Sequence, residues 1–101
     1  MFSLLDCISM ERLGEFCKRH HIRKLALFGS AIKGKLRADS DIDILVEFEN
    51  GFTPGLITFS GIEIELSDLI GRKVDLRTAG DLSRYFRAEV VNNARVEYVE
   101  R

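Results

Sequence analysis

Two aspartates, Asp41 and Asp43, stand in the most apolar stretch of the chain, which reads DIDILVEF. Aspartate is a poor strand former and resists burial, so a pair of them in a strand needs a reason. Residues two apart in a strand point to the same face, with Cα atoms roughly 6–7 Å apart. The two carboxylates therefore converge, and they would repel each other without a cation. Oxygen ligands of this kind suit Mg²⁺ or Mn²⁺, so the pair predicts a divalent metal site.

Upstream, Gly29 and Ser30 follow a short apolar segment and open about one helical turn. Glycine lets a ligand approach the backbone, while the N–H groups of the turn and the serine hydroxyl can hold phosphate oxygens. A phosphate-binding turn beside paired aspartates is what phosphoryl or nucleotidyl transfer requires. Asp75, in KVDLR, is the best candidate for a third acid, because its strand is predicted to pair beside that of the two aspartates.

Simpler interpretations of these residues stay open. The paired acids could be incidental on a solvated edge strand, the Gly29–Ser30 pair could be an ordinary turn, and Asp75 could face water. A calcium loop is excluded, because DSDID is followed by Ile44 at the sixth position and Asn50 at the twelfth, where glycine and glutamate are needed.

A basic loop separates the glycine–serine pair from the paired acids. Lys33, Lys35 and Arg37 lie in it, near the expected phosphates. These side chains could contact a triphosphate or a partner, or they could form a solvated face.

Helical and strand patterns alternate along the chain. Apolar residues at three- and four-residue steps predict a helix in SMERLGEFCKRHH, capped by Ser9, and a second helix from Phe59 to Leu69, ended by Gly71. Ser83 is expected to cap a third helix that shares one apolar face from residue 82 to residue 94.

Short apolar or alternating segments predict strands at 24–28, 41–48, 73–78 and 95–100. The order of the patterns predicts an α/β (α+β) fold, in which helices cover a small mixed, largely antiparallel β-sheet. The helix between the second and third strands could make a right-handed crossover, so part of the sheet could be parallel.

The composition limits the class of protein. The chain has 101 residues, of which 46% are hydrophobic and 31% charged, and this favours one folded domain with a modest core. A net charge of −1 argues against holding long nucleic acid by phosphate neutralisation. Acidic residues come before any long apolar run, which indicates neither a signal peptide nor a membrane span. The two cysteines form no CxxC pair, so a reducing cytoplasm is the expected location.

The segment GSAIKGKLRADSDIDILV resembles the signature of the DNA polymerase β nucleotidyltransferase superfamily, a Gly-Ser pair followed about ten residues later by Asp-x-Asp. With KVDLRT, LSRYFRAEVVNNA and the last strand, the chain resembles the minimal nucleotidyltransferase branch. The resemblance implies a single minimal nucleotidyltransferase domain over residues 1–101 and a polymerase-β-type nucleotidyltransferase fold.

The resemblance also implies roles for individual residues. Gly29 and Ser30, with Lys33 nearby, would bind the triphosphate of ATP, and the three aspartates would ligate Mg²⁺ or Mn²⁺ and carry catalysis. The family often has alanine and arginine where this chain has Ile32 and Lys33; the lysine keeps the charge but loses the bidentate fork of arginine.

Members of this branch are often antitoxins of a HEPN-domain ribonuclease toxin and transfer AMP from ATP to a tyrosine of that toxin, in a type VII-like toxin–antitoxin system. The resemblance therefore implies an ATP-dependent protein adenylyltransferase that forms a complex with such a partner. A chain of this size can build a floor for a nucleotide but hardly a second wall, which also favours an acceptor presented by a partner. One alternative is a binding module that masks the toxin with weak or no catalysis. A more remote one is a subunit that modifies RNA ends or small molecules.

Overall fold

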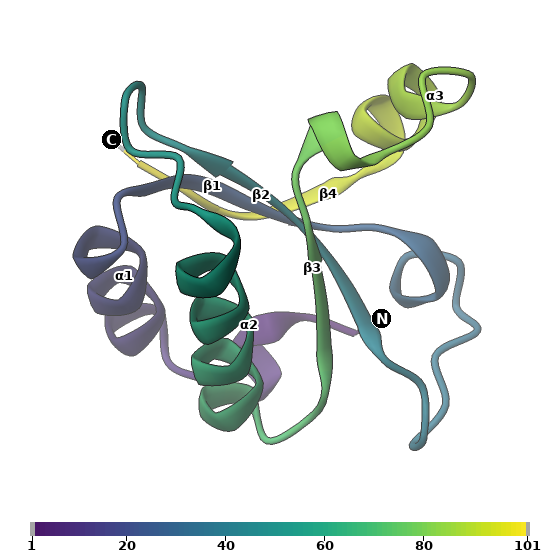
Figure 1. Cartoon of the computed structure of the whole chain (residues 1–101). Helices are drawn as coiled ribbons and strands as arrows, with labels where there is room; N and C mark the ends of the chain where they lie inside the picture. Colours follow the sequence, from purple (N-terminus) through teal and green to yellow (C-terminus); the bar gives the residue numbers. More distant parts are fainter. Residues whose placement is uncertain (1, 101) are drawn as a thin grey trace.

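The computed structural model describes residues 2–100, which form a sheet with helices on both sides (Figure 1). The helices are α1 (Met10–Arg19), α2 (Leu56–Ile70) and α3 (Arg87–Asn93). The strands are β1 (Ile22–Leu27), β2 (Ile42–Phe48), β3 (Val74–Arg77) and β4 (Arg95–Val99). Three short 3₁₀ helices, η1 (Leu4–Asp6), η2 (Gly29–Ala31) and η3 (Ala79–Asp81), complete the regular structure of these residues.

The strands form one sheet in the order β3-β2-β1-β4. β1 runs antiparallel to both β2 and β4, whereas β2 and β3 run parallel. The parallel pair exists because α2 carries the chain from the end of β2 back to the start of β3. The predicted fold class, a small mixed and largely antiparallel sheet covered by helices, is confirmed.

One face of the sheet is covered by α1 and α2, which lie side by side in Figure 1. α1 begins where predicted, because the Ser9 side chain accepts a hydrogen bond from the Arg12 N–H at 3.2 Å. Both helices bury one stripe of side chains against the strands. These residues are Leu13, Phe16 and Cys17 of α1 and Ile62, Leu66 and Ile70 of α2. The main hydrophobic core lies in this layer.

α2 also fixes the position of β3, which is an edge strand. The Ser67 hydroxyl accepts a hydrogen bond from the Val74 N–H at 2.9 Å, and a Glu63 carboxylate oxygen accepts one from the Leu76 N–H at 2.8 Å. β3 has no neighbouring strand on its outer side, so these two side chains satisfy N–H groups that would otherwise lack a partner in the sheet. Gly71 ends α2 in the left-handed region with φ of 79°, as predicted. The alignment of β3 beside β2 is therefore set by α2.

The opposite face of the sheet is covered only in part, by η3 and α3. A second, smaller apolar cluster lies there, made of Ala26, Leu45 and Leu82 with Val90 and Ala94 packed against it. The remainder of this face stays open to solvent, and it carries Asp43 and Asp75. We call it the open face.

The prediction that Ser83 caps the third helix is wrong, because α3 begins at Arg87 with Phe86 at the N-cap position. The Ser83 hydroxyl instead accepts a hydrogen bond from the Tyr85 N–H at 3.3 Å, and the Ser83 carbonyl accepts one from the Phe86 N–H at 3.2 Å. The serine therefore closes a separate turn before the helix.

Among residues 2–100, no helix has both the length and the apolar character that a membrane crossing would need.

Candidate active site

The three predicted acids lie together on the open face, where β2 and β3 begin. Asp43 and Asp75 are register partners on the parallel strands β2 and β3, so their side chains stand next to each other. Asp41 comes just before β2 and belongs to the same face by its position two residues from Asp43. Asp43 and Asp75 are half-buried, whereas Asp41 is exposed. The structure thus sets Asp75 beside Asp43 and places Asp41 two residues before Asp43, just ahead of β2.

The electrostatics of Asp43 reflect this crowding. Burial is the largest effect that raises the pKa of Asp43, followed by the like charges of Asp75 and then Asp41. The positive charge of Arg77 acts in the opposite direction and only partly offsets them. A half-buried carboxylate beside two further acids is the arrangement expected where a cation is meant to bind.

Gly29 lies directly against Asp43. The backbone at Gly29 is in the left-handed region with φ of 67°, and a Cβ atom built there would come 2.3 Å from Asp43 Oδ2. The two segments are joined by a hydrogen bond from the Phe28 N–H to the Asp43 carbonyl at 3.1 Å. A side chain at this position would need a rare backbone conformation and would also collide with the carboxylate. Glycine is therefore required by the site, not only by the turn.

The segment after Gly29 forms the single helical turn that the sequence predicts, as η2. The Gly29 carbonyl accepts a hydrogen bond from the Ile32 N–H at 3.3 Å, and the Ser30 carbonyl accepts one from the Lys35 N–H at 3.2 Å. Ile32, one of the two departures from the family pattern, packs against the main core. Its bulk is therefore turned into the protein, and the open face is not narrowed by it.

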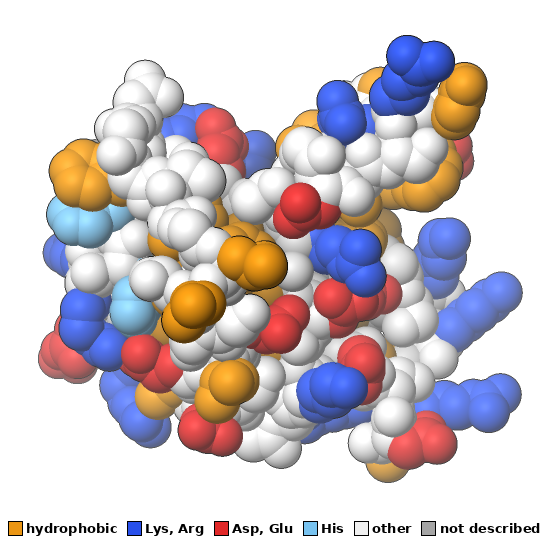
Figure 2. Space-filling view, viewed as in Figure 1, with side chains coloured by type: hydrophobic (Ala, Val, Ile, Leu, Met, Phe, Trp, Pro, Cys, Tyr) orange, Lys and Arg blue, Asp and Glu red, His pale blue; other side chains and the backbone are white. Residues whose placement is uncertain are grey.

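Lys33 is exposed and makes no ion pair within residues 2–100. Figure 2 shows basic side chains standing out from the right edge of the molecule, where Figure 1 draws the loop between η2 and β2. Lys33, Lys35 and Arg37 are all exposed in this loop. The structure brings Gly29 to the acids but leaves the triphosphate role of Lys33 as a prediction.

The sequence interpretation missed two cations that pair with the acids. Arg77 of β3 pairs with Asp75, and Lys73, just before β3, pairs with Asp41. Arg77 donates to both Asp75 oxygens, with Nε–Oδ1 at 3.2 Å and Nη2–Oδ2 at 3.4 Å, and these hydrogen bonds raise the pKa of the guanidinium. Lys73 Nζ lies 3.8 Å from Asp41 Oδ2. The signal was present in KVDLR, because its lysine, aspartate and arginine alternate and so share one face.

The donor set fits a divalent metal ion, although its members are not yet arranged around one. Among residues 2–100, no three His, Cys, Asp or Glu side chains lie close enough to form a ready ligand group. The three acids nevertheless offer only carboxylate oxygens, which Mg²⁺ and Mn²⁺ prefer. Burial, and then the like charges of Asp75 and Asp41, raise the pKa of Asp43, and the charge of Arg77 offsets this only in part. The chemistry of the residues therefore suits the ion, and side-chain rotation would have to complete the site.

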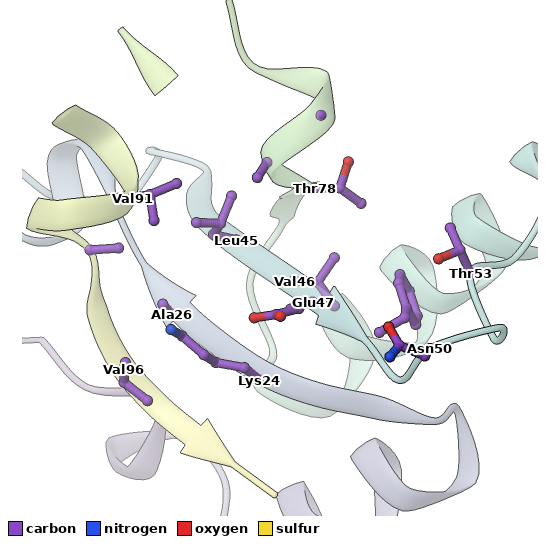
Figure 3. Close-up of a pocket in the computed structure, with 14 residues that line it drawn as sticks. Lys24, Ala26, Leu45, Val46, Glu47, Asn50, Thr53, Thr78, Val91 and Val96 are labelled. Atoms are coloured by element: carbon purple, nitrogen blue, oxygen red, sulfur yellow. The ribbon is translucent and has the colours of Figure 1, made fainter. Parts of the chain in front are cut away.

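A pocket of about 580 Å³ extends along the open face beyond the acids (Figure 3). Leu45, two residues after Asp43 on β2, forms part of its floor, and Thr78, which follows β3, stands at its rim. Ala26 and Val96 add to the apolar floor, and Glu47 is one of its polar groups. Asp43 and part of the pocket floor thus lie on the same face of β2.

Three other titratable side chains, Glu47, His20 and His21, have structural roles. Glu47 lies on the same face of β2 as Asp43. Arg23 Nε donates a hydrogen bond to it at 3.2 Å, so this acid is already paired. His20 contacts Glu65 at 3.0 Å on the far side of the sheet, and His21 stacks on Phe52 with ring centroids 3.9 Å apart. Neither histidine belongs to the acid cluster.

A family model and known proteins match more than half of the chain. A family model described as a nucleotidyltransferase domain matches residues 10–98. The protein adenylyltransferase MntA of Thermococcus cleftensis is 42% identical over 62 residues, which are 61% of this chain and 61% of that protein. This chain therefore spans less than two thirds of the length of that relative.

Solved structures share the fold. A structure provisionally described as a minimal nucleotidyltransferase is 34% identical, with a TM-score of 0.68 over 83% of this chain and 84% of that chain. A complex of tri-AMPylated Shewanella oneidensis HEPN toxin with MNT antitoxin has a TM-score of 0.62 and 20% identity, over 89% of this chain and 69% of that chain. At that identity, the second likeness concerns the fold alone.

Proposed function

We propose that this chain, which belongs to the nucleotidyltransferase domain family, is a protein adenylyltransferase that transfers AMP from ATP to a tyrosine of a HEPN-domain toxin and acts as its antitoxin. The observation that carries the proposal is the contact of Gly29 with Asp43, on a face where Asp75 lies in register with Asp43. The turn accepts only glycine and lies against clustered carboxylates. A phosphate tail bound at the turn would therefore lie next to the metal ligands.

In the proposed reaction, the acceptor oxygen bonds to the α-phosphorus of ATP while the bond to the departing pyrophosphate breaks. The turn at Gly29 and Ser30 holds the departing phosphates, with Lys33 within the same loop as an added positive charge. Asp75 accepts the proton of the acceptor hydroxyl at a carboxylate oxygen. Mg²⁺ or Mn²⁺, held by the three aspartates, would compensate charge at the attacking and leaving oxygens.

The pocket on the open face supports an acceptor that a second protein supplies. Its volume of about 580 Å³ exceeds what an aromatic side chain needs, and its floor of Ala26, Leu45 and Val96 suits an aromatic ring. Leu45 lies two positions from Asp43 on the same face, so a hydroxyl at the tip of the bound side chain can reach the acids.

The partner is proposed from the relatives. A similar protein is named the adenylyltransferase MntA, and the fold recurs in a complex of an antitoxin with an AMPylated HEPN toxin. We assign the reaction to the cytoplasm, because Cys7 and Cys17 are both free thiols and a reducing compartment keeps them so.

The proposal is tested by co-expressing the chain with a HEPN protein encoded beside its gene and measuring the intact mass of that partner. An AMP adduct on tyrosine is expected with the wild-type chain and is expected to vanish with the double variant Asp41→Asn, Asp43→Asn. Asp39→Asn is the matched control, because Asp39 is an exposed acid in the loop before the same strand, and full labelling is expected.

Two results would argue against the proposal. Labelling that persists in a correctly folded double variant would remove the acids from catalysis. A stable complex with a partner that is never modified, in the presence of ATP and Mg²⁺, would favour the binding module over the enzyme.

A further inference from the structure

The two outer acids of the candidate site are held by cations of the protein itself. Arg77 donates to both oxygens of Asp75, and Lys73 lies 3.8 Å from Asp41. Asp43, between them, makes no ion pair within residues 2–100. This pairing gives a physical reason why no three acids form a ready ligand group among residues 2–100.

Arg77 is the stronger of the two cations. A guanidinium with two hydrogen bonds to one carboxylate fixes its direction as well as its charge, whereas an ammonium at 3.8 Å acts only as a point charge. Arg77 and Asp75 are two residues apart on one strand, so the pair forms without any change in the backbone. The side chain of Lys73 is 78% exposed, against 47% for Arg77, and its contact is correspondingly looser.

We propose that Arg77 is the resident counterion of Asp75. A divalent metal ion must displace Arg77 from Asp75 before the three acids can converge. The inference rests on the proposed function, because it takes the acids as metal ligands. The two N–H groups of Arg77 take up two of the roughly four lone-pair sites of the Asp75 carboxylate and hold it turned toward the guanidinium, so a metal ion competes with Arg77 for it. Metal binding and the release of Arg77 are then one event.

The surroundings of Arg77 allow such an exchange. Its side chain is 47% exposed, so water can solvate the guanidinium as it leaves Asp75. An exposed ion pair of this kind weakens the binding of a competing metal ion by no more than about fivefold, so metal binding can break the pair. Arg77 also lies opposite Leu45 in the register of β2 and β3, between the acids and the pocket. The released guanidinium is therefore next to the pocket in which the acceptor side chain is proposed to bind.

The direct test follows the ¹⁵N–¹H signal of Arg77 Nε by NMR while Mg²⁺ alone is added to the whole chain. In the wild type, the signal is expected to move from a hydrogen-bonded to a solvated position in step with the backbone signals of Asp43. In Asp75→Asn, it is expected to begin near the solvated position and to move little.

A binding measurement separates direct competition from general charge. In titration calorimetry with Mn²⁺ and no nucleotide, Arg77→Gln is expected to bind Mn²⁺ about two- to fivefold more tightly than the wild type. Arg77→Lys keeps the charge but loses the fork, so it is expected to bind between the two. Lys73→Gln, the matched control for removing a positive charge, is expected to have a smaller effect than Arg77→Gln.

The outcomes distinguish this inference from the proposed function. An Arg77 signal that stays in place while the Asp43 signals respond to Mg²⁺ would overturn the inference alone. Equal effects of Arg77→Gln and Lys73→Gln, with Arg77→Lys unchanged from the wild type, would do the same, because only general charge would then be involved. If the wild type bound Mn²⁺ no better than Asp43→Asn, the metal site itself and both proposals would fail.

Discussion

The two faces of β2 place neighbouring residues in opposite surroundings. Ile42 and Ile44 are fully buried beneath the helices, while Asp43, between them, turns to the open face and lies beside Asp75. Leu45 continues the open face into the pocket. A single strand therefore contributes to the core with one set of residues and to the candidate site with the other.

Stability and chemistry are therefore divided between the two faces of the sheet. Among residues 2–100, the buried side chains of the helix-covered face are all apolar, and burial of their area is the main source of stability. On the open face, burial and then the like charges of Asp75 and Asp41 raise the pKa of Asp43, which means that its ionisation opposes folding. Burial on the helix-covered face is expected to offset the free-energy cost of the crowded charges on the open face.

The largest effect on stability is expected from Leu66→Ala, on the helix-covered face. Leu66 is fully buried on α2 within the main core, and such a truncation costs about 2–5 kcal/mol of the free energy of unfolding. Urea unfolding followed by circular dichroism measures this. The folded fraction is expected to keep its AMP-transfer activity at low temperature. A large loss of activity in the folded protein would show that the two faces are not independent.

Gly29→Ala is expected to have the next largest effect, and it acts on the open face. The new Cβ would approach Asp43 Oδ2 to 2.3 Å at a backbone φ of 67°, so both strain and displacement of the carboxylate follow. We expect a loss of about 1–3 kcal/mol in the free energy of unfolding and a fall in activity of roughly 100-fold.

Gly34→Ala is the matched control for this glycine. Gly34 has a φ of 69°, but a Cβ there would meet nothing within 4 Å. It therefore carries the backbone strain without the collision, and its cost is expected to be about 1 kcal/mol with activity retained. Equal losses of activity in the two variants would remove the contact with Asp43 as the cause.

Much of this arrangement can be read from the sequence. Alternation in DIDILVEF assigns both faces of β2, and Gly71 marks the end of α2 because glycine alone readily adopts its φ of 79°. The pairing of β3 beside β2 was expected, and it brings Asp75 to Asp43. These features follow from local chemistry and short-range topology.

Other features depend on tertiary contacts that no local pattern contains. Ser83 has the residue type of a helix cap, yet its hydroxyl accepts a bond from the Tyr85 N–H and the helix starts later. The ion pair of Arg77 with Asp75 depends on which rotamers the neighbouring charges favour. The pocket depends on where α3 and η3 settle over the sheet, and it could not be predicted.

A smaller effect is expected from Asp43→Asn, which should change how the stability of the protein depends on pH. Because burial and like charges raise the pKa of Asp43 above its ordinary 3.8, the folded state binds more protons than the unfolded state between the two values. Stability therefore falls as the pH rises through that window, and the charged group opposes folding above it.

Asparagine removes this charge. At neutral pH, Asp43→Asn is expected to be more stable than the wild type by about 0.5 kcal/mol, or a Tm higher by ~2–4 °C, and the difference is expected to vanish near about pH 3. Thermal unfolding over a pH series without divalent ions measures it. A variant that is less stable at neutral pH would show that Asp43 forms favourable contacts that outweigh its repulsion.

The smallest effect is expected from Ile64→Ala, two residues from Leu66 on the same helix. Ile64 is 62% exposed, and Figure 2 shows apolar side chains standing out over the position of α2. Little area is lost to water on truncation, and alanine has the higher helix propensity, so the free energy of unfolding is expected to change by no more than about 0.5 kcal/mol. Urea unfolding at two protein concentrations is the measurement. A loss comparable to that of Leu66→Ala, or one that depends on concentration, would mean that this side of α2 is buried against another chain in solution, and the division between a covered and an open surface would have to be redrawn.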